Sequence, residues 1–254
     1  MKSYIIGLAG NKNSGKDTVA SMINYIFAVG ATKARFSEWI LKRVSYDETY
    51  KDRIIHFADS LKDCLSIIYN IPRSAFDDRH MKDEMYYSLI SGNFISREIV
   101  NTYNFDYNVI TSEILKHSSL KDELETYDEL NHVITIRTLM QYFGTEVCRE
   151  NLGRNIWIKS ALGKIVDIAT NRRLCIVTDV RFTNEAAAIH KRDASLYGVS
   201  IRVNRPDSNN DNRDYHDSEI IAFSTDYSIN NNSTLTSLFY KTLEICQKIL
   251  SEQL

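Results

Sequence analysis

The hydrophobic residues of this chain fall into short continuous runs separated by longer amphipathic segments. The runs lie at Tyr4–Ala9, Ile54–Ala58, Leu174–Val180, Val199–Val203 and Tyr227–Ile229. Near-continuous hydrophobicity is typical of parallel strands that helices cover on both faces of the sheet. The pattern therefore predicts an α/β fold with a doubly wound parallel sheet, in which ligands bind at the carboxyl ends of the strands.

Between these runs, mainly apolar residues recur at spacings of three and four, which indicates helices with one buried face. The positions of these stripes are Val19, Met22, Ile23, Ile26 and Phe27; Leu61, Cys64, Leu65 and Ile68; Ile158, Ala161, Leu162, Ile165 and Ala169; and Leu235, Leu238, Phe239, Thr242, Cys246, Ile249 and Leu250. Strands and helices thus alternate along most of the chain.

The alternation is interrupted between the second and third predicted strands. Residues 72–136 are mostly polar, and Ser112–Leu130 is dense in Glu, Lys and Asp. We interpret 72–136 as a helical insertion on the substrate side of a core made of 1–71 and 137–254, with most of its charges facing solvent. A second irregular stretch, about 204–217, is rich in Asn and Asp and predicts a short lid, because long loops in compact domains tend to be functional.

The overall composition is that of an ordinary globular protein. The chain has 254 residues, of which 43% are hydrophobic and 25% are charged, with a formal net charge of −2. Such a balance argues against a nucleic-acid polymer as partner and leaves a small anionic substrate. The four cysteines are widely spaced without a C-x-x-C pair, and no stretch is long enough for a signal peptide or a membrane span. We therefore expect a cytoplasmic protein.

A glycine-rich loop directly follows the first predicted strand. Residues Gly10–Lys16 read G-x-x-x-x-G-K and precede a helical stripe. In this strand–loop–helix context, the backbone N–H groups and the helix N-terminus bind phosphates, and the lysine reaches the β- and γ-phosphates of a nucleotide. The residue after the lysine is normally Ser or Thr, which holds Mg²⁺, whereas here Asp17 occupies that position and Thr18 comes one place later.

Charged residues also follow two other predicted strands. Asp59 and Lys62 come after the second strand, where Asp59 as a simple helix cap is an equally good interpretation. Asp179 ends the third strand, as an acid ends the Mg²⁺-associated strand of many phosphate-loop proteins, and Arg181 and Glu185 follow it. These residues would lie at the edge of the sheet where ligands bind.

The segment around Arg137 is the next most informative. On a helix, Arg137 and Gln141 share one face, a turn away from Thr145. An arginine binds phosphate bidentately, and a glutamine amide can hydrogen-bond to a base edge. Trp157, further along, would either stack on a base or pack in the core, and His216–Glu219 is best interpreted as a capped helix start.

Taken together, these motifs resemble the deoxynucleoside monophosphate kinases of tailed bacteriophages. The matching segments are Ser14–Thr18 (S-G-K-D-T), Phe57–Lys62 (F-A-D-x-L-K), Arg137–Glu146 (R-x-L-x-Q-x-x-G-T-E), Trp157, Thr178–Ala186 (T-D-V-R-F-x-N-E-A), Arg202–Pro206 (R-V-x-R-P) and His216–Glu219 (H-D-S-E). Their order and spacing extend over nearly the whole chain. In that family Asp follows the loop lysine, so Asp17 is an expected variant, whereas Ser60 replaces the usual proline.

The resemblance implies a three-layer P-loop kinase fold, with a five-stranded parallel sheet, a helical monophosphate-binding insertion and a short lid. It implies transfer of the γ-phosphoryl group of ATP to deoxynucleoside 5′-monophosphates, with Mg²⁺. By position, Lys16, Arg137 and Arg181 would be catalytic. ATP would be held by Asn13, Ser14, Gly15, Lys16, Asp17, Thr18 and Arg205. The metal would be held by Asp17, Thr18 and Asp179. The monophosphate would be held by Asp59, Lys62, Arg137, Gln141, Gly144, Thr145, Trp157, Asp179, Arg181 and Glu185.

Two other functions fit parts of the pattern. A kinase of another small phosphorylated metabolite, such as a phosphomevalonate-type kinase, also uses G-K-D. A nucleotide-binding regulator without an acceptor would leave the arginines and Gln141 without a purpose. The sequence leaves open the bases accepted, the choice of deoxyribose or ribose, the oligomeric state (monomer or homodimer), the choice of Asp17 or Thr18 as metal ligand, and the role of residues 31–53.

Overall fold

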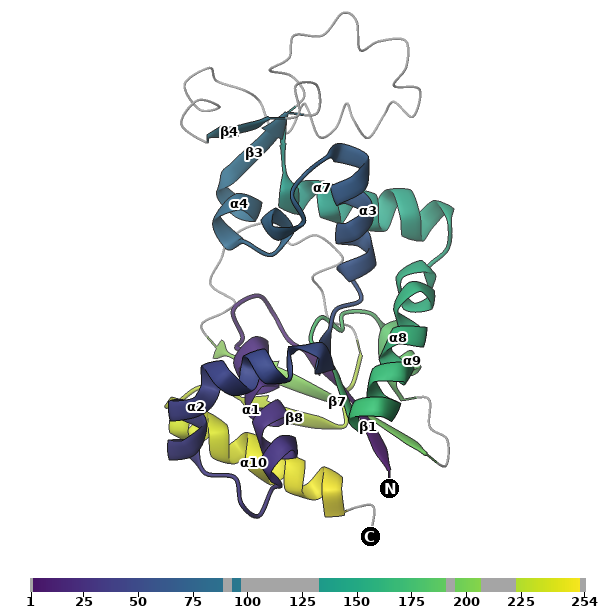
Figure 1. Cartoon of the computed structure of the whole chain (residues 1–254). Coiled ribbons are helices and arrows are strands. Elements are labelled where there is room, and N and C mark those ends of the chain that lie inside the picture. Colours follow the sequence, from purple (N-terminus) through teal and green to yellow (C-terminus); the bar gives the residue numbers. More distant parts are fainter. Residues whose placement is uncertain (1, 89–92, 97–132, 191–194, 207–222, 252–254) are drawn as a thin grey trace, which may run out of the picture. The chain divides into compact units, whose positions relative to one another are not determined.

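A computed structural model describes residues 2–88, 93–96, 133–190, 195–206 and 223–251 (Figure 1). The chain divides into two compact units, which are described separately. The first unit contains Met1–Asp59 and Asn155–Leu254, and the second contains Ser60–Arg154. The predicted division into a core and a functional insertion at 72–136 stays a prediction.

The first unit is built on a five-stranded, all-parallel sheet. Its strands are β1 (Ser3–Ala9), β2 (Ile54–Ile55), β6 (Leu174–Val177), β7 (Leu196–Asn204) and β8 (Tyr227–Asn230), in the spatial order β2-β6-β1-β7-β8. The first strand, β1, is therefore central. The chain leaves β1 toward β2 at one edge of the sheet, and it leaves the neighbouring strand β7 toward β8 at the other edge. In open α/β sheets, ligands bind at the carboxyl ends of two neighbouring strands whose connections diverge in this way.

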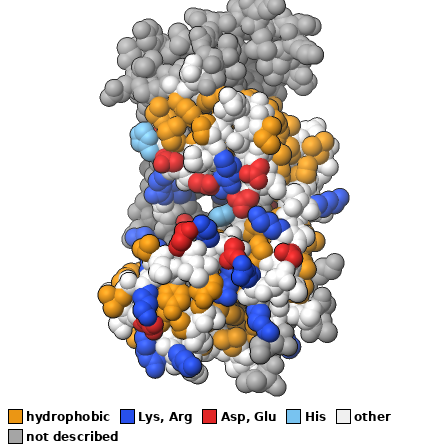
Figure 2. Space-filling model, in the orientation of Figure 1, with side chains coloured by type: hydrophobic (Ala, Val, Ile, Leu, Met, Phe, Trp, Pro, Cys, Tyr) orange, Lys and Arg blue, Asp and Glu red, His pale blue; other side chains and the backbone are white. Residues whose placement is uncertain are grey.

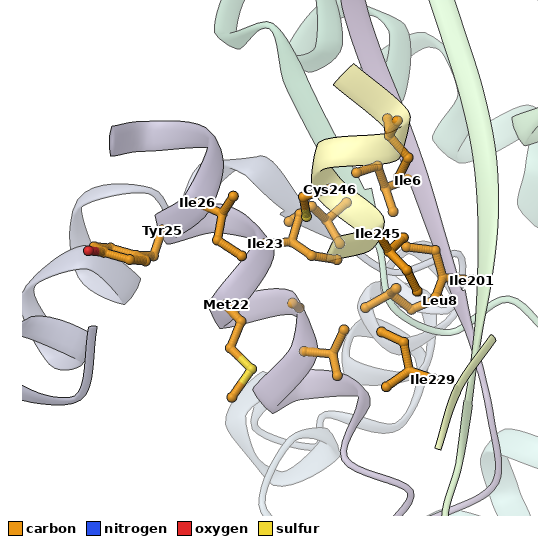
Figure 3. Close-up of a cluster of buried hydrophobic side chains, with 14 of the residues drawn as sticks. Ile6, Leu8, Met22, Ile23, Tyr25, Ile26, Ile201, Ile229, Ile245 and Cys246 are labelled. Carbon is orange, nitrogen blue, oxygen red and sulfur yellow. The ribbon is translucent and has the colours of Figure 1, made fainter. Parts of the chain in front are cut away.

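Helices cover both faces of this sheet, which gives three layers (Figure 1). One face carries α1 (Lys16–Val29), α2 (Phe36–Thr49) and α10 (Leu235–Ser251), and the other carries α8 (Ile156–Arg172) and α9 (Thr183–Ile189). Along β1 the buried side chains alternate between the layers, since Ile6 and Leu8 belong to one cluster and Ile5 and Ala9 to the other. Figure 3 shows the first cluster, in which strand residues meet α1 and α10.

Residues 31–53, whose role the sequence left open, form α2 and the short 3₁₀ helix η1 (Lys51–Arg53). Trp39 of α2 is fully buried, and its ring centroid lies 6.0 Å from that of Phe239 in α10. The indole N–H donates to the Ser21 hydroxyl of α1 at 3.2 Å. The segment thus completes the helical layer on this face of the sheet.

All five predicted strands are present, and the α/β prediction is confirmed. Two of them end earlier than the hydrophobic runs suggest, namely β2 at Ile55 and β6 at Val177. For β2 the reason is the Asp179 carboxylate, which accepts hydrogen bonds from the backbone N–H groups of Phe57 at 2.8 Å and Ala58 at 3.0 Å. These donors are therefore satisfied by a side chain instead of a neighbouring strand.

The second unit combines short helices with a three-stranded antiparallel sheet. Its elements are α3 (Asp59–Tyr69, which begins one residue before the unit), η2 (Arg73–Phe76), α4 (Arg79–Glu84), β3 (Met85–Ser88), β4 (Phe94–Ser96), β5 (Val133–Thr135), α7 (Ile136–Tyr142) and the π-helical η4 (Phe143–Arg149). The sheet order is β4-β3-β5. Leu65, Phe76, Ile136 and Leu139 are buried in this unit.

The described part of 72–136, predicted to be helical, contains the helices η2 and α4, but it also contains three strands that were not predicted, β3, β4 and β5. These strands are only three or four residues long, too short for a visible alternation. They use aromatic and β-branched residues, which fit a half-buried pleated surface. Ser112–Leu130, part of this prediction, lies outside the described residues, as do 207–217 of the predicted lid and His216–Glu219.

The close approach of α9 to the sheet leads to a stability prediction. A Cβ at Gly198 in β7 would lie 1.7 Å from the backbone oxygen of Ile189, whereas a Cβ at Gly163 in α8 would meet nothing within 4 Å. Because backbone cannot move aside as a side chain can, Gly198→Ala is expected to lower the free energy of unfolding by about 3 kcal/mol or more. Urea denaturation followed by circular dichroism measures this change.

Gly163→Ala is the matched control, since it adds the same methyl group inside a helix without a clash. It is expected to raise the free energy of unfolding by about 0.5–1 kcal/mol. Equal effects of the two substitutions would contradict the packing of α9 against β7.

Candidate active site

The glycine-rich loop connects β1 to α1 at the carboxyl edge of the sheet. Gly15 is the N-cap residue of α1 and has a φ of 97°, a left-handed conformation that favours glycine. A side chain there would also meet Asn231, whose Nδ2 would lie 2.6 Å from a Cβ. Asn13 has a φ of 65°, which asparagine tolerates better than most residues. The loop therefore has a curled backbone of the kind that phosphate-binding loops require.

Hydrogen bonds hold this loop in shape. The Lys16 ammonium donates to the carbonyl oxygens of Gly10 at 2.6 Å and Asn11 at 2.8 Å. Asn231, which follows β8, donates from Nδ2 to the Ser14 carbonyl at 2.9 Å. The Ser14 hydroxyl is buried, and no described residue hydrogen-bonds to its Oγ. The loop thus places a cation, a hydroxyl and a helix N-terminus together, which is a donor set suited to phosphate oxygens.

Asn231 is a supporting residue that the sequence analysis missed, because it lies 217 positions from Ser14. Asn231→Ala removes one hydrogen bond that fixes the loop, worth about 1 kcal/mol. We expect the affinity of the loop for nucleotide phosphates to fall about fivefold. Calorimetric titration with a nucleoside triphosphate measures this change, and an affinity equal to that of wild type would contradict the supporting role of Asn231.

The predicted residues after β6 are anchored by backbone hydrogen bonds. Besides the two bonds that Asp179 accepts, the Glu185 carboxylate accepts from the backbone N–H groups of Arg181 at 2.9 Å and Phe182 at 3.1 Å. Glu185 is buried and caps the N-terminus of α9. Asp179 and Glu185 therefore shape the carboxyl edge of the sheet. Their contacts with nucleotides stay predictions.

The predicted metal ligands are divided between two elements. Asp17 and Thr18 lie in the first turn of α1, where Asp17 is exposed and Thr18 is partly buried, and Asp179 follows β6. Within the described part of the chain, no group of three or more His, Cys, Asp and Glu side chains is arranged to hold a metal ion. A carboxylate and a hydroxyl beside a phosphate loop are nevertheless suitable for Mg²⁺, which usually takes only one or two protein ligands together with nucleotide phosphates.

Three other predicted residues lie at separate places in the first unit. Asp59 begins α3, and its Oδ2 accepts from the backbone N–H of His56 at 2.9 Å, so it closes a turn. Trp157 is 7% exposed in the first turn of α8. Arg205 is exposed directly after β7. The base-stacking role of Trp157 and the lid role of Arg205 stay predictions.

The second unit holds a network of ion pairs around the predicted acceptor residues. Lys62 donates to Oδ1 of Asp77 at 2.8 Å, and Arg137 donates from Nε to Oδ1 of Asp83 at 2.6 Å. Arg73 also pairs with Asp77, at 2.5 Å. Although burial opposes ionisation of Asp77, its pairs with Lys62 and Arg73 hold the pKa of this carboxyl below its usual range. Lys62 and Arg137, which the sequence analysis assigned to one monophosphate site, thus lie in the same unit, and each is held by a carboxylate.

Gln141, Gly144 and Thr145 follow Arg137 along α7 and η4. The predicted continuous helix changes here into a π-helix over Phe143–Arg149. Such segments are uncommon and are frequent at functional sites. Gly144 is buried, and a Cβ on it would lie 2.8 Å from Cδ2 of Leu61 in α3.

Lys82 of α4 also belongs to this network but was not predicted. Burial, reinforced by the charges of Arg137 and Lys62 and partly offset by Asp83 and Asp77, lowers the pKa of its ammonium to about 8. In the sequence it is one charge among several in D-D-R-H-M-K-D-E. Only the folded unit places it beside two other cations.

Charges of both signs are mixed on the face of the molecule that Figure 2 shows. Figure 2 shows Lys and Arg side chains interspersed with Asp and Glu on the visible face. This agrees with the formal net charge of −2. None of the helices that the structure describes combines the length and hydrophobicity needed for a membrane span.

The fold and the loop together define the class of protein. A five-stranded parallel α/β sheet, with a G-x-x-x-x-G-K loop between its first strand and a helix, is consistent with a P-loop kinase fold. A family model described as deoxynucleotide monophosphate kinase matches residues 4–242, and the chain therefore belongs to this family. It is a kinase of deoxynucleotide metabolism that acts on small molecules. A search of curated proteins gives no match.

Proposed function

We propose that this kinase transfers the γ-phosphoryl group of ATP to a deoxynucleoside 5′-monophosphate, which yields ADP and the deoxynucleoside diphosphate. The observation that carries the proposal is the curled loop with Lys16 at its end, in a chain that matches the family over residues 4–242. Phosphoryl transfer needs little covalent assistance from a protein. Positioning and positive charge around the transferred group supply most of the catalysis.

On the ATP side, residues 13–18 would hold the phosphates. The buried Ser14 hydroxyl suits a phosphate oxygen, because no described residue hydrogen-bonds to it. The Gly15 backbone also suits one, because Gly15 is the N-cap residue of α1 and helix N-termini bind anions. Lys16 would exchange its two carbonyl contacts for phosphate oxygens. A Mg²⁺ ion bound with ATP would neutralise phosphate charge, and Asp17, Thr18 and Asp179 are the residues that would hold it.

On the acceptor side, Lys62 and Arg137 would bind the monophosphate, and Gln141 would hydrogen-bond to the base. A guanidinium fixed at Nε by a carboxylate keeps its other N–H groups in a defined plane, which suits bidentate recognition of a phosphate. Arg181 would assist transfer through its charge. Asp59, Gly144, Thr145, Trp157 and Glu185 complete the proposed acceptor set, and Arg205 would reach ATP from the lid.

A cytoplasmic location is part of this proposal. All four cysteines are free thiols, and three of them, Cys148, Cys175 and Cys246, are buried. Unpaired cysteines are typical of proteins in a reducing compartment.

An assay of ADP release tests the proposed reaction. Purified protein with ATP and Mg²⁺ is given, in turn, each of the four deoxynucleoside monophosphates, their ribose counterparts and phosphomevalonate. We expect stimulation by at least one deoxynucleoside monophosphate. Stimulation by phosphomevalonate alone would instead identify a kinase of another metabolite, and steady ATP hydrolysis without stimulation by any acceptor would indicate a regulator or an ATPase.

A further inference from the structure

Of the three cations Lys62, Arg137 and Lys82 in the charge network of the second unit, the first two each pair with a carboxylate of the described residues and the third does not. Asp77 pairs with Lys62 at 2.8 Å, and Asp83 pairs with Arg137 at 2.6 Å. Lys82 precedes Asp83 on α4 but forms no ion pair with any carboxylate of the described residues. Its Nζ makes one long hydrogen bond, 3.4 Å, to the Phe76 carbonyl. Lys82 thus lies near two other cations, Arg137 and Lys62, and pairs directly with no carboxylate in the described part of the chain.

Such an arrangement is unfavourable in the absence of an anion. A lysine loses hydration when it is partly buried, and nearby like charges add to the free-energy cost. The elements packed against α4 supply both signs of charge. The charged and titratable side chains of these elements and of α4 itself, apart from Lys82, are Arg73, Arg79, His80, Asp83, Glu84, Tyr86, Tyr87, Arg137 and Tyr142; β5 contributes none. Lys62 of α3 and Asp77, which follows η2, also act on Lys82 through their charges. A ligand with two negative charges would balance the network better than one carboxylate.

We propose that Lys82 is a phosphate-binding residue of the acceptor site, where it contacts the monophosphate dianion together with Lys62 and Arg137. This inference rests on the proposed function, since it assigns one more residue to the acceptor. Lys62 and Arg137 are held by their carboxylates in fixed positions. Among the described residues no carboxylate pairs with the Lys82 ammonium, which is therefore the charge most available to the ligand.

A pH dependence distinguishes this role from a purely structural one. Because the pKa of Lys82 is lowered to about 8, its ammonium is present below that pH and is lost above it. Binding of a phosphate dianion favours the ammonium form. The acceptor KM should therefore rise as the pH increases from about 7 to about 9.5, whereas the ATP KM should not follow this change.

Three variants test the proposal. Lys82→Met keeps the approximate length of the side chain but removes its charge. Lys82→Arg keeps a positive charge that does not titrate in this pH range. Lys159→Met, the control, replaces an exposed lysine of α8 by methionine. At about pH 7, Lys82→Met should raise the acceptor KM about 10- to 100-fold and lose the rise with pH. Lys82→Arg should keep a low KM that no longer rises, and Lys159→Met should behave as wild type.

Calorimetric binding of deoxynucleoside monophosphates and of inorganic phosphate, at about pH 7 and about pH 9.5, separates this inference from the proposed reaction. Binding weakened by Lys82→Met supports the site even if no transfer occurs, an outcome in which the proposed reaction alone fails. If wild type and Lys82→Met show the same acceptor affinity and the same pH profile, Lys82 does not bind the phosphate. Thermal unfolding checks the variants, and Lys82→Met should be no less stable than wild type because a partly buried charge is removed.

Discussion

Replacement of Lys16 by alanine should reduce kcat/KM for phosphoryl transfer by about 150- to 1000-fold, with the fold retained. The Lys16 ammonium is held over the loop by the carbonyls of Gly10 and Asn11, at 2.6 and 2.8 Å. From this position it would stabilise the charge that develops on the transferred phosphoryl group. Removal of one preorganised charged donor from such a site costs about 3–4 kcal/mol of transition-state stabilisation. The coupled ADP-release assay measures the loss.

The control for this variant is Lys33→Ala, the same change at an exposed lysine of the first unit. It should keep wild-type activity. The far-ultraviolet circular dichroism of both variants should match wild type, because alanine is a good helix former and suits the start of α1, where Lys16 lies. A Lys16→Ala variant that retains more than about a tenth of wild-type activity would exclude a role for this lysine in the transition state.

Arg137→Ala is expected to have the second largest effect. We predict an increase of about 100-fold in the acceptor KM, because a bidentate guanidinium–phosphate contact would be lost. The substitution should also lower stability, since Asp83, with its side chain only 12% exposed, would lose the partner at 2.6 Å. Kinetics with varied acceptor measure the first effect, and urea denaturation measures the second.

A double variant separates the two effects of Arg137. Arg137→Ala combined with Asp83→Asn removes both charges, so it should recover much of the lost stability but not the acceptor KM. Arg137→Lys should recover little of the KM, because an ammonium cannot replace a planar fork. An acceptor KM that returns to the wild-type value in the double variant would show that Arg137 acts only by neutralising Asp83.

The core of the fold could be predicted because its signal is local. Each strand of the parallel sheet is buried on both faces, so it appears in the sequence as a continuous apolar run such as Tyr4–Ala9. The strand ends were less predictable. β2 ends at Ile55 because Asp179, more than a hundred positions away, takes the backbone donors of Phe57 and Ala58.

The second unit was harder to predict because its sheet depends on contacts between residues far apart in the sequence. Strands β3 and β5 pair across more than forty residues, with Tyr86 opposite Thr135, and neither strand is long enough to show a period. The order of the sequence therefore gave no indication of the antiparallel sheet. The same holds for the site, since the loop from Gly10 to Lys16 is contiguous and visible, whereas Lys82 and Asn231 acquire their neighbours only on folding.

The central claim is that a phosphoryl group passes from ATP to a deoxynucleoside monophosphate. Its most direct test follows the γ-phosphate of isotopically labelled ATP by chromatography of the reaction products, with each deoxynucleoside monophosphate as acceptor. We expect label in the deoxynucleoside diphosphate in amounts equal to the ADP formed, and about 150- to 1000-fold slower transfer with Lys16→Ala. Label that appears only as inorganic phosphate, whatever the acceptor, would contradict this claim.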